Sequence, residues 1–133
     1  MSEIPGATLK EMLDLIIGGD PVKCQAVDST HGYVSGTSEF MADLVGGSFL
    51  GTELDLAETT TTNGEVTSAG GSLGTIAGGD FVDGLAIFRD TGSPATDRIL
   101  EFIDTNSDNT DMLKEGDGGT MTVTFPSGIV FRI

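Results

Sequence analysis

The first regular pattern of apolar and polar positions along the chain has the period of a helix. Between Thr8 and Ile17, apolar residues recur at i, i+3, i+4, i+7 and i+8, which places them on one helical face. Thr8 can serve as the N-cap with Glu11 three residues later, and two glycines and a proline follow to end the helix. A helix of about ten residues is marginal in water, so its apolar stripe must be buried on this chain or on a neighbour. The stripe consists of Leu9, Met12, Leu13, Ile16 and Ile17.

After Pro21 the pattern changes to short runs of β-forming residues separated by glycines. Phe40, Met41 and Leu44 stand at helical spacing and predict a short helix within 38–44. Strands at the observed spacing are typical of sandwiches and barrels. We therefore expect an all-β fold, a single-domain antiparallel β-sandwich or barrel with a short N-terminal helix. The runs predict strands at 22–27, 51–56, 65–68, 72–76, 81–89, 98–104, 120–125 and 129–133.

The strictest alternation lies in the last part of the sequence. Met121, Val123 and Phe125 alternate with threonines, and a second alternating run covers 129–133. Pro126-Ser127-Gly128 separates the two runs, and a three-residue connection of this kind is typical of a β-hairpin. We expect the two runs to pair with each other across this turn.

Length and composition limit the chain to one core. Its 133 residues amount to one ordinary domain, in which we expect 1–21 to form a helical arm and 22–133 the β-domain. Glycine contributes 20 residues, hydrophobic residues make up 38% of the chain, and there is no tryptophan. This is a sparse core for a free-standing monomer of this size. Assembly would supply the missing burial, so we expect a homo-oligomer, a trimer or a dimer, or docking on a larger partner.

The charge of the chain excludes several classes of partner. Six Lys and Arg stand against 21 Asp and Glu, which gives a formal charge of −15. Such a surface repels nucleic acids and anionic membranes, and the longest apolar runs, 15–17 and 85–88, are far shorter than the ~20 residues of a membrane-spanning helix. We expect no nucleic acid and no membrane as a partner. A docking surface on this chain must concentrate apolar residues and the few cations, while the acidic loops face water.

One acidic stretch matches part of a calcium-binding loop. Asp104, Asn106, Asp108 and Glu115 occupy positions 1, 3, 5 and 12 of an EF-hand loop, where oxygen ligands stand. Position six holds Asn109 instead of glycine, and the glycine-rich stretch after Glu115 does not start the exiting helix. Ca²⁺ is therefore the one cofactor that the sequence suggests. The alternative is an acidic, solvated connection between two strands.

No residue set indicates catalysis. His31 is the only histidine, and no Gly-x-Ser-x-Gly elbow frames a serine near it. A loop histidine that hydrogen-bonds or faces water is the simpler interpretation. Cys24, the only cysteine, falls at an apolar-facing strand position and has no clustered base, as is typical of a small buried hydrophobic residue. We therefore expect no enzyme activity.

Two stretches of the C-terminal half carry a resemblance to a known family. In the first, an apolar strand runs into Asp90-Thr91-Gly92, and a second strand carries the pair Ile103-Asp104. In the second, a Gly118-Gly119 turn precedes a Thr-Val hairpin and the tail Ile-Val-Phe-Arg-Ile at 129–133. With weaker matches between 22 and 44, the chain resembles a family of small structural proteins of tailed bacteriophages. Proteins of this family are assigned as virion, head-decoration or cement proteins.

The resemblance implies a structural role without catalytic residues. It implies an all-β domain on the outer capsid surface of a virion, made in the host cytoplasm, that binds the major capsid protein and stabilises the shell. The main alternative is a tail, fibre or host-surface-binding component of the same particle, and a small metal- or sugar-binding enzyme is a third hypothesis.

The helical stripe lies outside the region of resemblance, which makes its five apolar residues candidates for contact with a neighbouring subunit or with the capsid. Alternatively, the helix plugs the end of its own barrel, because a surface helix buries its apolar face in either case.

Overall fold

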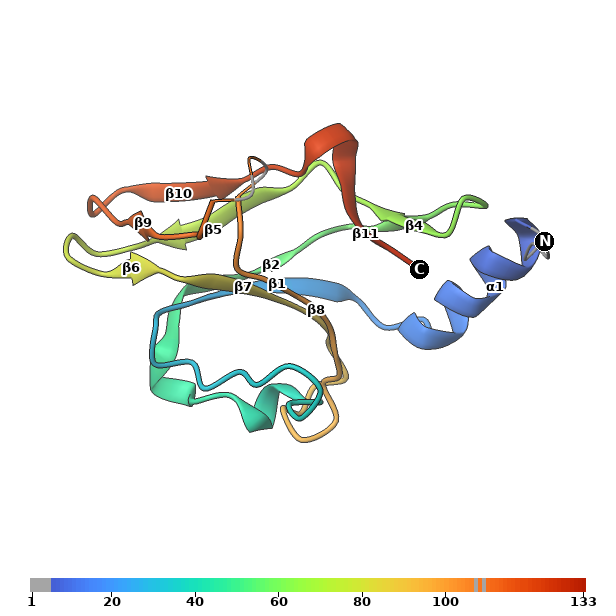
Figure 1. Ribbon diagram of the computed structural model, residues 1–133, viewed down its shortest axis with the longest axis horizontal. Helices are drawn as coiled ribbons and strands as arrows, with labels where there is room; N and C mark the ends of the chain where they lie inside the picture. Colours follow the sequence, from blue (N-terminus) through green and yellow to red (C-terminus); the bar gives the residue numbers. More distant parts are fainter. Residues whose placement is uncertain (1–5, 107, 109) are drawn as a thin grey trace.

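The computed structural model describes residues 6–106, 108 and 110–133, and it is an all-β fold with one short helix at the N-terminal end (Figure 1). No helix within these residues is long and apolar enough to cross a membrane. The elements are α1 (Gly6–Ile17), β1 (Val22–Val27), the 3-10 turns η1 (Met41–Asp43) and η2 (Gly46–Ser48), β2 (Phe49–Asp55), β3 (Thr59–Thr60), β4 (Glu65–Thr67), β5 (Gly71–Thr75), β6 (Phe81–Val82), β7 (Gly84–Arg89), β8 (Ile99–Ile103), β9 (Lys114–Glu115), β10 (Thr120–Val123), the 3-10 turn η3 (Pro126–Gly128) and β11 (Ile129–Arg132).

The main sheet has the strand order β2-β1-β7-β8, and all its neighbours are antiparallel. β1 and β7 pair without interruption from Val22 opposite Arg89 to Val27 opposite Gly84. A β-bulge interrupts the β1–β2 pairing at Gln25, whose side-chain amide donates to the carbonyl oxygen of Leu50 at 2.9 Å. The buried amide thereby satisfies a carbonyl at the place where the bulge disturbs the ladder.

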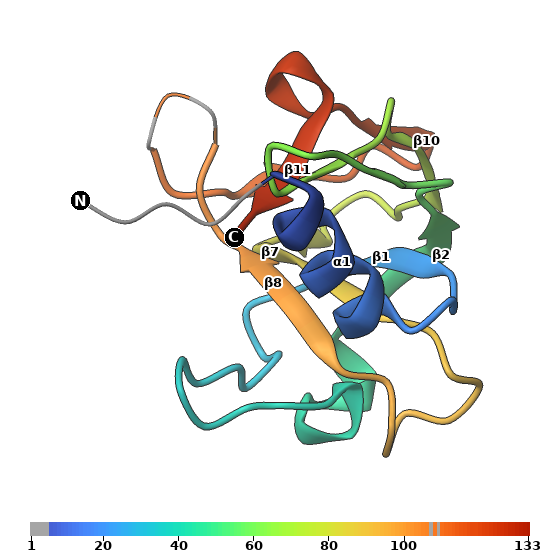
Figure 2. The same ribbon diagram turned by 90° about the vertical axis from the view of Figure 1, so that its right-hand side faces the viewer.

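A second layer of short strands covers one face of the main sheet (Figure 1). In this layer β10 pairs with β5, and β11 pairs with β4, which also pairs with β3. β6 and β9 form a small ribbon at the end opposite α1. The helix closes the other end, which faces the viewer in Figure 2. The result is a sandwich with its core between two layers.

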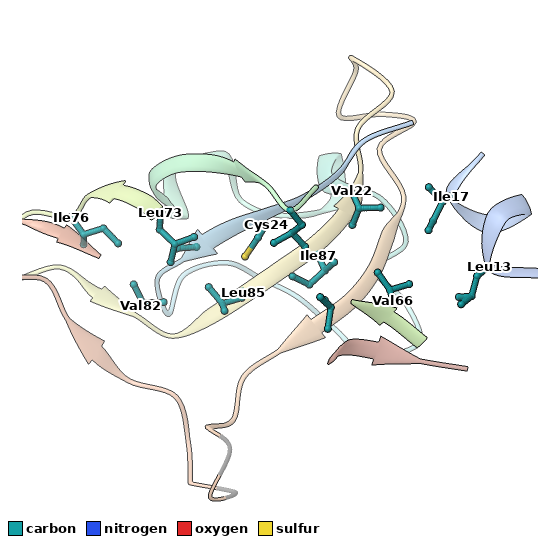
Figure 3. Packing of buried hydrophobic residues seen from close by; sticks show 13 residues of the cluster. Leu13, Ile17, Val22, Cys24, Val66, Leu73, Ile76, Val82, Leu85 and Ile87 are labelled. Carbon is teal, nitrogen blue, oxygen red and sulfur yellow. The ribbon is translucent and has the colours of Figure 1, made fainter. Parts of the chain in front are cut away.

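The principal core lies between the two layers and is continuous with the helix (Figure 3). Leu13 and Ile17 of α1 are buried in the same cluster as strand residues from both layers. The buried members are Leu13, Ile17, Val22, Cys24, Ala26, Leu56, Val66, Leu73, Ile76, Val82, Leu85, Ile87 and Val130.

A smaller core lies on the opposite face of the main sheet. The chain between β1 and β2 folds under this face and brings Met41 and Leu44 against Ala86 and Phe88 of β7. β7 is therefore buried on both faces, which accounts for its nearly continuous apolar sequence.

The expected hairpin across Pro126–Gly128 is wrong. β10 pairs with β5 and β11 with β4, so the two alternating runs belong to different sheets. η3 turns the chain around a corner, with Ser127 at φ 56° and Gly128 at φ 72°. The chain also bends between the consecutive strands β4 and β5, next to η3. There the Ser68 N–H donates to the Gly128 carbonyl oxygen at 2.8 Å, and Gly70 adopts φ 78°. The strand before η3 pairs with β5 and the strand after it pairs with β4. Alternation alone does not distinguish this arrangement from a hairpin.

Smaller differences lie at the ends of elements. α1 begins at Gly6, so Thr8 lies inside the helix and is not its N-cap. The expected strand 81–89 is divided at Asp83, whose backbone N–H donates to the carbonyl oxygen of Val27 at 2.8 Å. Segment 38–44 contains the 3-10 turn η1 in place of the expected helix. β3 and β9 went unpredicted because two residues do not establish a period.

Candidate interaction surface

An open groove of about 990 Å³ runs along one side of the sandwich. β8 contributes Glu101 and Ile103 to one wall, and the segment from β10 to β11 forms the other. Six of the side chains that line the groove are apolar, only partly buried, and packed against the principal core. They are Ile103, Met112, Met121, Val123, Phe125 and Phe131.

Edge strands border the groove. Within the described part of the chain, β8 is the last strand of the main sheet, β10 has β5 as its one neighbour, and β11 has β4. Part of the β8 edge is already covered: Phe40 bridges Arg98 and the Ile99 N–H donates to the Glu39 carbonyl oxygen at 2.9 Å at its start, and Thr105 bridges Asp111 just after its end. Edge strands carry backbone N–H and C=O groups that a further strand can pair with. The two layers of the sandwich are therefore not joined along this side by a strand of the described residues.

Glu101 brings a carboxylate to an otherwise apolar part of the wall. Glu101 lies opposite Ile87 of β7, and Ile103 is the next residue of β8 on the same face. Its side chain is therefore on the core side of β8. No described lysine, arginine or histidine lies within ion-pair distance of it. Glu101 is exposed, yet partial desolvation raises the pKa of its carboxyl, and the Phe102 backbone N–H offsets only part of that rise.

The groove differs from the rest of the surface in charge. Among the described residues that line it are one carboxylate, Glu101, and two cations, Lys114 and Arg132, on a chain with 21 carboxylates and 6 cations. The Arg132 guanidinium is already paired with Glu65 at 2.7 Å. The connection between β8 and β9 reaches the groove with Thr105, Asn106 and Met112, none of which is a carboxylate. The groove is therefore the apolar, carboxylate-poor part of this surface among the described residues, and its use as a docking surface stays a prediction.

The helical stripe singled out from the sequence is divided between two environments. Leu13 and Ile17 are buried in the principal core, and Leu9 is half-buried. Met12 and Ile16 are exposed, and so is Leu15, which is 79% exposed. The inner residues thus pack on their own chain. Contact of the outer residues with a neighbouring subunit or with a capsid stays a prediction.

The described residues of the acidic loop hydrogen-bond to one another. The Asn106 amide donates to Thr110 Oγ1 at 3.1 Å, and Asp108 Oδ1 accepts from the Thr110 hydroxyl at 2.6 Å. Glu115 lies in β9 opposite Phe81, and no group of three or more His, Cys, Asp or Glu that could hold a metal gathers within the described residues. Asn109, the sixth position of the suggested Ca²⁺ loop, lies outside the described residues. The Ca²⁺ site of Asp104, Asn106, Asp108 and Glu115 stays a prediction.

His31 and Cys24 both serve the fold. His31 Nδ1 accepts the Tyr33 backbone N–H at 2.8 Å, which leaves the proton on Nε2, and this nitrogen lies 3.2 Å from Asp83 Oδ2. The imidazole also packs on Phe102 with ring centroids 4.9 Å apart. Cys24 is fully buried, and desolvation raises the pKa of its thiol to about 12. A thiol with that pKa stays protonated at neutral pH and is a poor nucleophile.

Glu101 was not singled out from the sequence. A single carboxylate in the apolar run Ile-Leu-Glu-Phe-Ile of β8 could have drawn attention to it. Its face could not be assigned, however, because a bulge shifts the β7–β8 register between Ile87 and Phe88.

No protein-family model matches this chain, and neither a curated protein nor a solved structure matches it. The functional argument therefore depends on the residues and on their arrangement.

Proposed function

We propose that this chain is a structural protein of a bacteriophage virion that binds the outer capsid surface and stabilises the shell. The resemblance of its C-terminal half to small head-decoration proteins supports this proposal. So does a charge of −15, which suits an outward-facing position away from packaged nucleic acid.

The observation that carries the proposal is the open groove. It presents partly buried apolar side chains and one carboxylate on a chain that is otherwise strongly acidic. Apolar area exposed in a concave, edge-bordered site is typical of a surface that a protein partner covers. Docking of the major capsid protein at this groove would bury that area and stabilise the small domain by mass action.

Copy number tests the proposal. Purified particles are digested, and this chain is quantified by mass spectrometry against the major capsid protein. A decoration protein approaches the number of capsid subunits. A few copies to a few dozen per particle would instead support the alternative of a tail, fibre or host-surface-binding component, and absence from particles would contradict both.

The salt dependence of binding tests the apolar character of the contact. Apolar docking holds or strengthens as sodium chloride rises, because salt screens the repulsion between acidic surfaces without weakening apolar burial. Particle occupancy is titrated against sodium chloride. A steep loss of occupancy at moderate salt would show that the acidic loops, and not the groove, make the contact.

A further inference from the structure

We infer that the groove between β8 and the β10–β11 segment binds an extended strand of another protein, with a basic side chain of that strand opposite Glu101. The inference rests on the proposed function only for the identity of that protein, the capsid shell. The inference specifies that the bound segment is extended, that it carries a basic side chain, and that Glu101 is the residue opposite this side chain.

The free strand edges argue for an extended segment. β8 is an edge strand whose outer edge has no described backbone partner from Leu100 to Ile103, and β10 and β11 are edge strands on the other side of the groove. A segment that adds a strand to β8 satisfies backbone groups along this edge, while alternate side chains enter the apolar groove. A helix or a compact ligand would fill the groove but leave the edge without backbone partners.

Glu101 argues for a basic side chain on that segment. Glu101 lies in register with Ile87, on the same face of β8 as Ile103; it is exposed to water in the free protein, and the structure gives it no cationic partner among the described residues. A covering strand would remove further water from Glu101. An apolar strand without a cation would leave this charge desolvated and unpaired, whereas a lysine or arginine opposite it would compensate the charge.

The charges of the chain argue against a second copy as the occupant. Two copies would each bring a charge of −15 to the contact. Of the six cations, Arg98 stacks 4.8 Å from the Phe40 ring centroid, and Lys114 lies in the groove itself. The other four are already in ion pairs, so a second copy has no uncommitted cation outside the groove to place opposite Glu101. These pairs are Lys10–Asp14, Lys23–Asp90, Arg89–Asp20 and Arg132–Glu65.

A displayed peptide library tests the inference directly. Random peptides of about nine residues, ~30 Å when extended, are selected on the full-length protein. We expect the recovered peptides to alternate apolar residues and to carry a lysine or arginine at one position. Glu101→Gln should lower the affinity for these peptides about fivefold to tenfold. Selection on the Glu101→Lys variant should return peptides with an acidic residue in place of the basic one.

Two matched variants locate the binding site. Met121→Arg places a charged side chain in the groove and should lower peptide affinity by more than about tenfold. Ser35→Arg adds the same charge at an exposed loop position outside the groove and should leave affinity unchanged. Thermal melts establish that each variant is folded. The inference is overturned if no peptide is recovered or if the recovered peptides show no preference for a basic residue. It is also overturned if the Met121→Arg variant binds the peptides with the affinity of wild type.

The same variants separate this inference from the proposed function. If the peptides behave as expected but particles lack the chain, the proposed function fails and the strand-binding groove stands. If particles carry the chain at capsid-like copy number and bind Met121→Arg as well as wild type, the groove inference fails alone.

Discussion

The centre of the main sheet and the edges around the groove are built differently: we call the central strands β1 and β7 the closed side, and the edge strands β8, β10 and β11 the open side. On the closed side, β1 and β7 pair over six residues, and almost every position of both strands is buried. On the open side, β8, β10 and β11 contain mostly half-buried and exposed positions around the groove. Both sides carry apolar residues at core-facing positions, but only the closed side removes them from water.

This difference divides stability from binding. Free energy of unfolding depends on the apolar area that folding buries, so it should be concentrated on the closed side and in α1. The half-buried residues of the open side retain apolar area that a partner can cover. Truncation of an apolar side chain on the closed side should therefore lower the free energy of unfolding. The same truncation on the open side should mainly weaken binding to the partner.

The largest expected effect contrasts two isoleucines. Ile87 of β7 is fully buried, whereas Ile129 of β11 is half-buried in the groove wall. Ile87→Ala should lower the free energy of unfolding by about 3–4 kcal/mol, because it leaves a cavity in the closed side. Ile129→Ala should cost about 1 kcal/mol but weaken particle binding. Chemical denaturation of both variants measures the first quantity, and equal losses of stability would remove the distinction between the sides.

A second contrast uses two leucines of α1. Leu13 is 0% exposed and Leu15 is 79% exposed. Leu13→Ala should lower the free energy of unfolding by about 2–3 kcal/mol, while Leu15→Ala should stay within about 0.5 kcal/mol of wild type. Thermal or urea melts give both values. If Leu13→Ala leaves the melt unchanged, the helix is an independent arm and not part of the core.

A third substitution tests how dry the closed side is. Cys24→Ser keeps the size of the side chain but places a hydroxyl among apolar neighbours, which should cost about 1–2 kcal/mol. Cys24 should also resist thiol reagents until the protein unfolds, because burial raises its pKa to about 12. Rapid labelling of the native protein would contradict the buried position.

The smallest effect concerns the charge on the open side. Because the pKa of Glu101 is raised above its ordinary value of 4.5, the folded state binds the proton more tightly than the unfolded state does. The contribution of this group to the free energy of unfolding is therefore complete below 4.5 and is lost as the pH rises through the folded-state pKa.

Glu101→Gln should then be slightly more stable than wild type at pH 7, by less than about 0.5 kcal/mol after solvent screening. The difference should vanish as the pH falls below 4.5. Paired urea denaturation curves at several pH values measure it. A variant that is less stable than wild type at pH 7 would indicate that Glu101 is already compensated.

The sequence was a good guide to single elements and a poor guide to their partners. The helix was recognised because five apolar residues keep its period, and β1 was placed correctly at 22–27 because the Gly-Gly-Asp-Pro stretch at 18–21 separates it from the helix. The strand predicted to pair with β10 was wrong, because alternation identifies which residues share a face of a strand but not which strand lies beside it. Pairing of strands distant in sequence depends on where the chain bends, as at Gly70.

The groove could not be predicted for the same reason. Ile103 and Met121 lie far apart in the sequence; Ile103 was recognised only as part of the expected strand 98–104, and Met121 only as an apolar position of an alternating strand. Whether such residues are covered depends on whether the two layers meet, which is a property of the whole sheet order. The division of the helical stripe into buried Leu13 and exposed Ile16 depends on how α1 is rotated against the sandwich.

Amide hydrogen exchange of the free and the particle-bound protein tests the central claim, that the open side is where the partner binds. Free protein should exchange slowly at β1 and β7 and faster at the outer edge of β8 and at β10 and β11. On particles, new protection should appear at β8, β10 and β11 and leave β1 and β7 unchanged. Protection gained only at α1 or at the acidic β8–β9 connection, with the groove strands unchanged, would contradict the account.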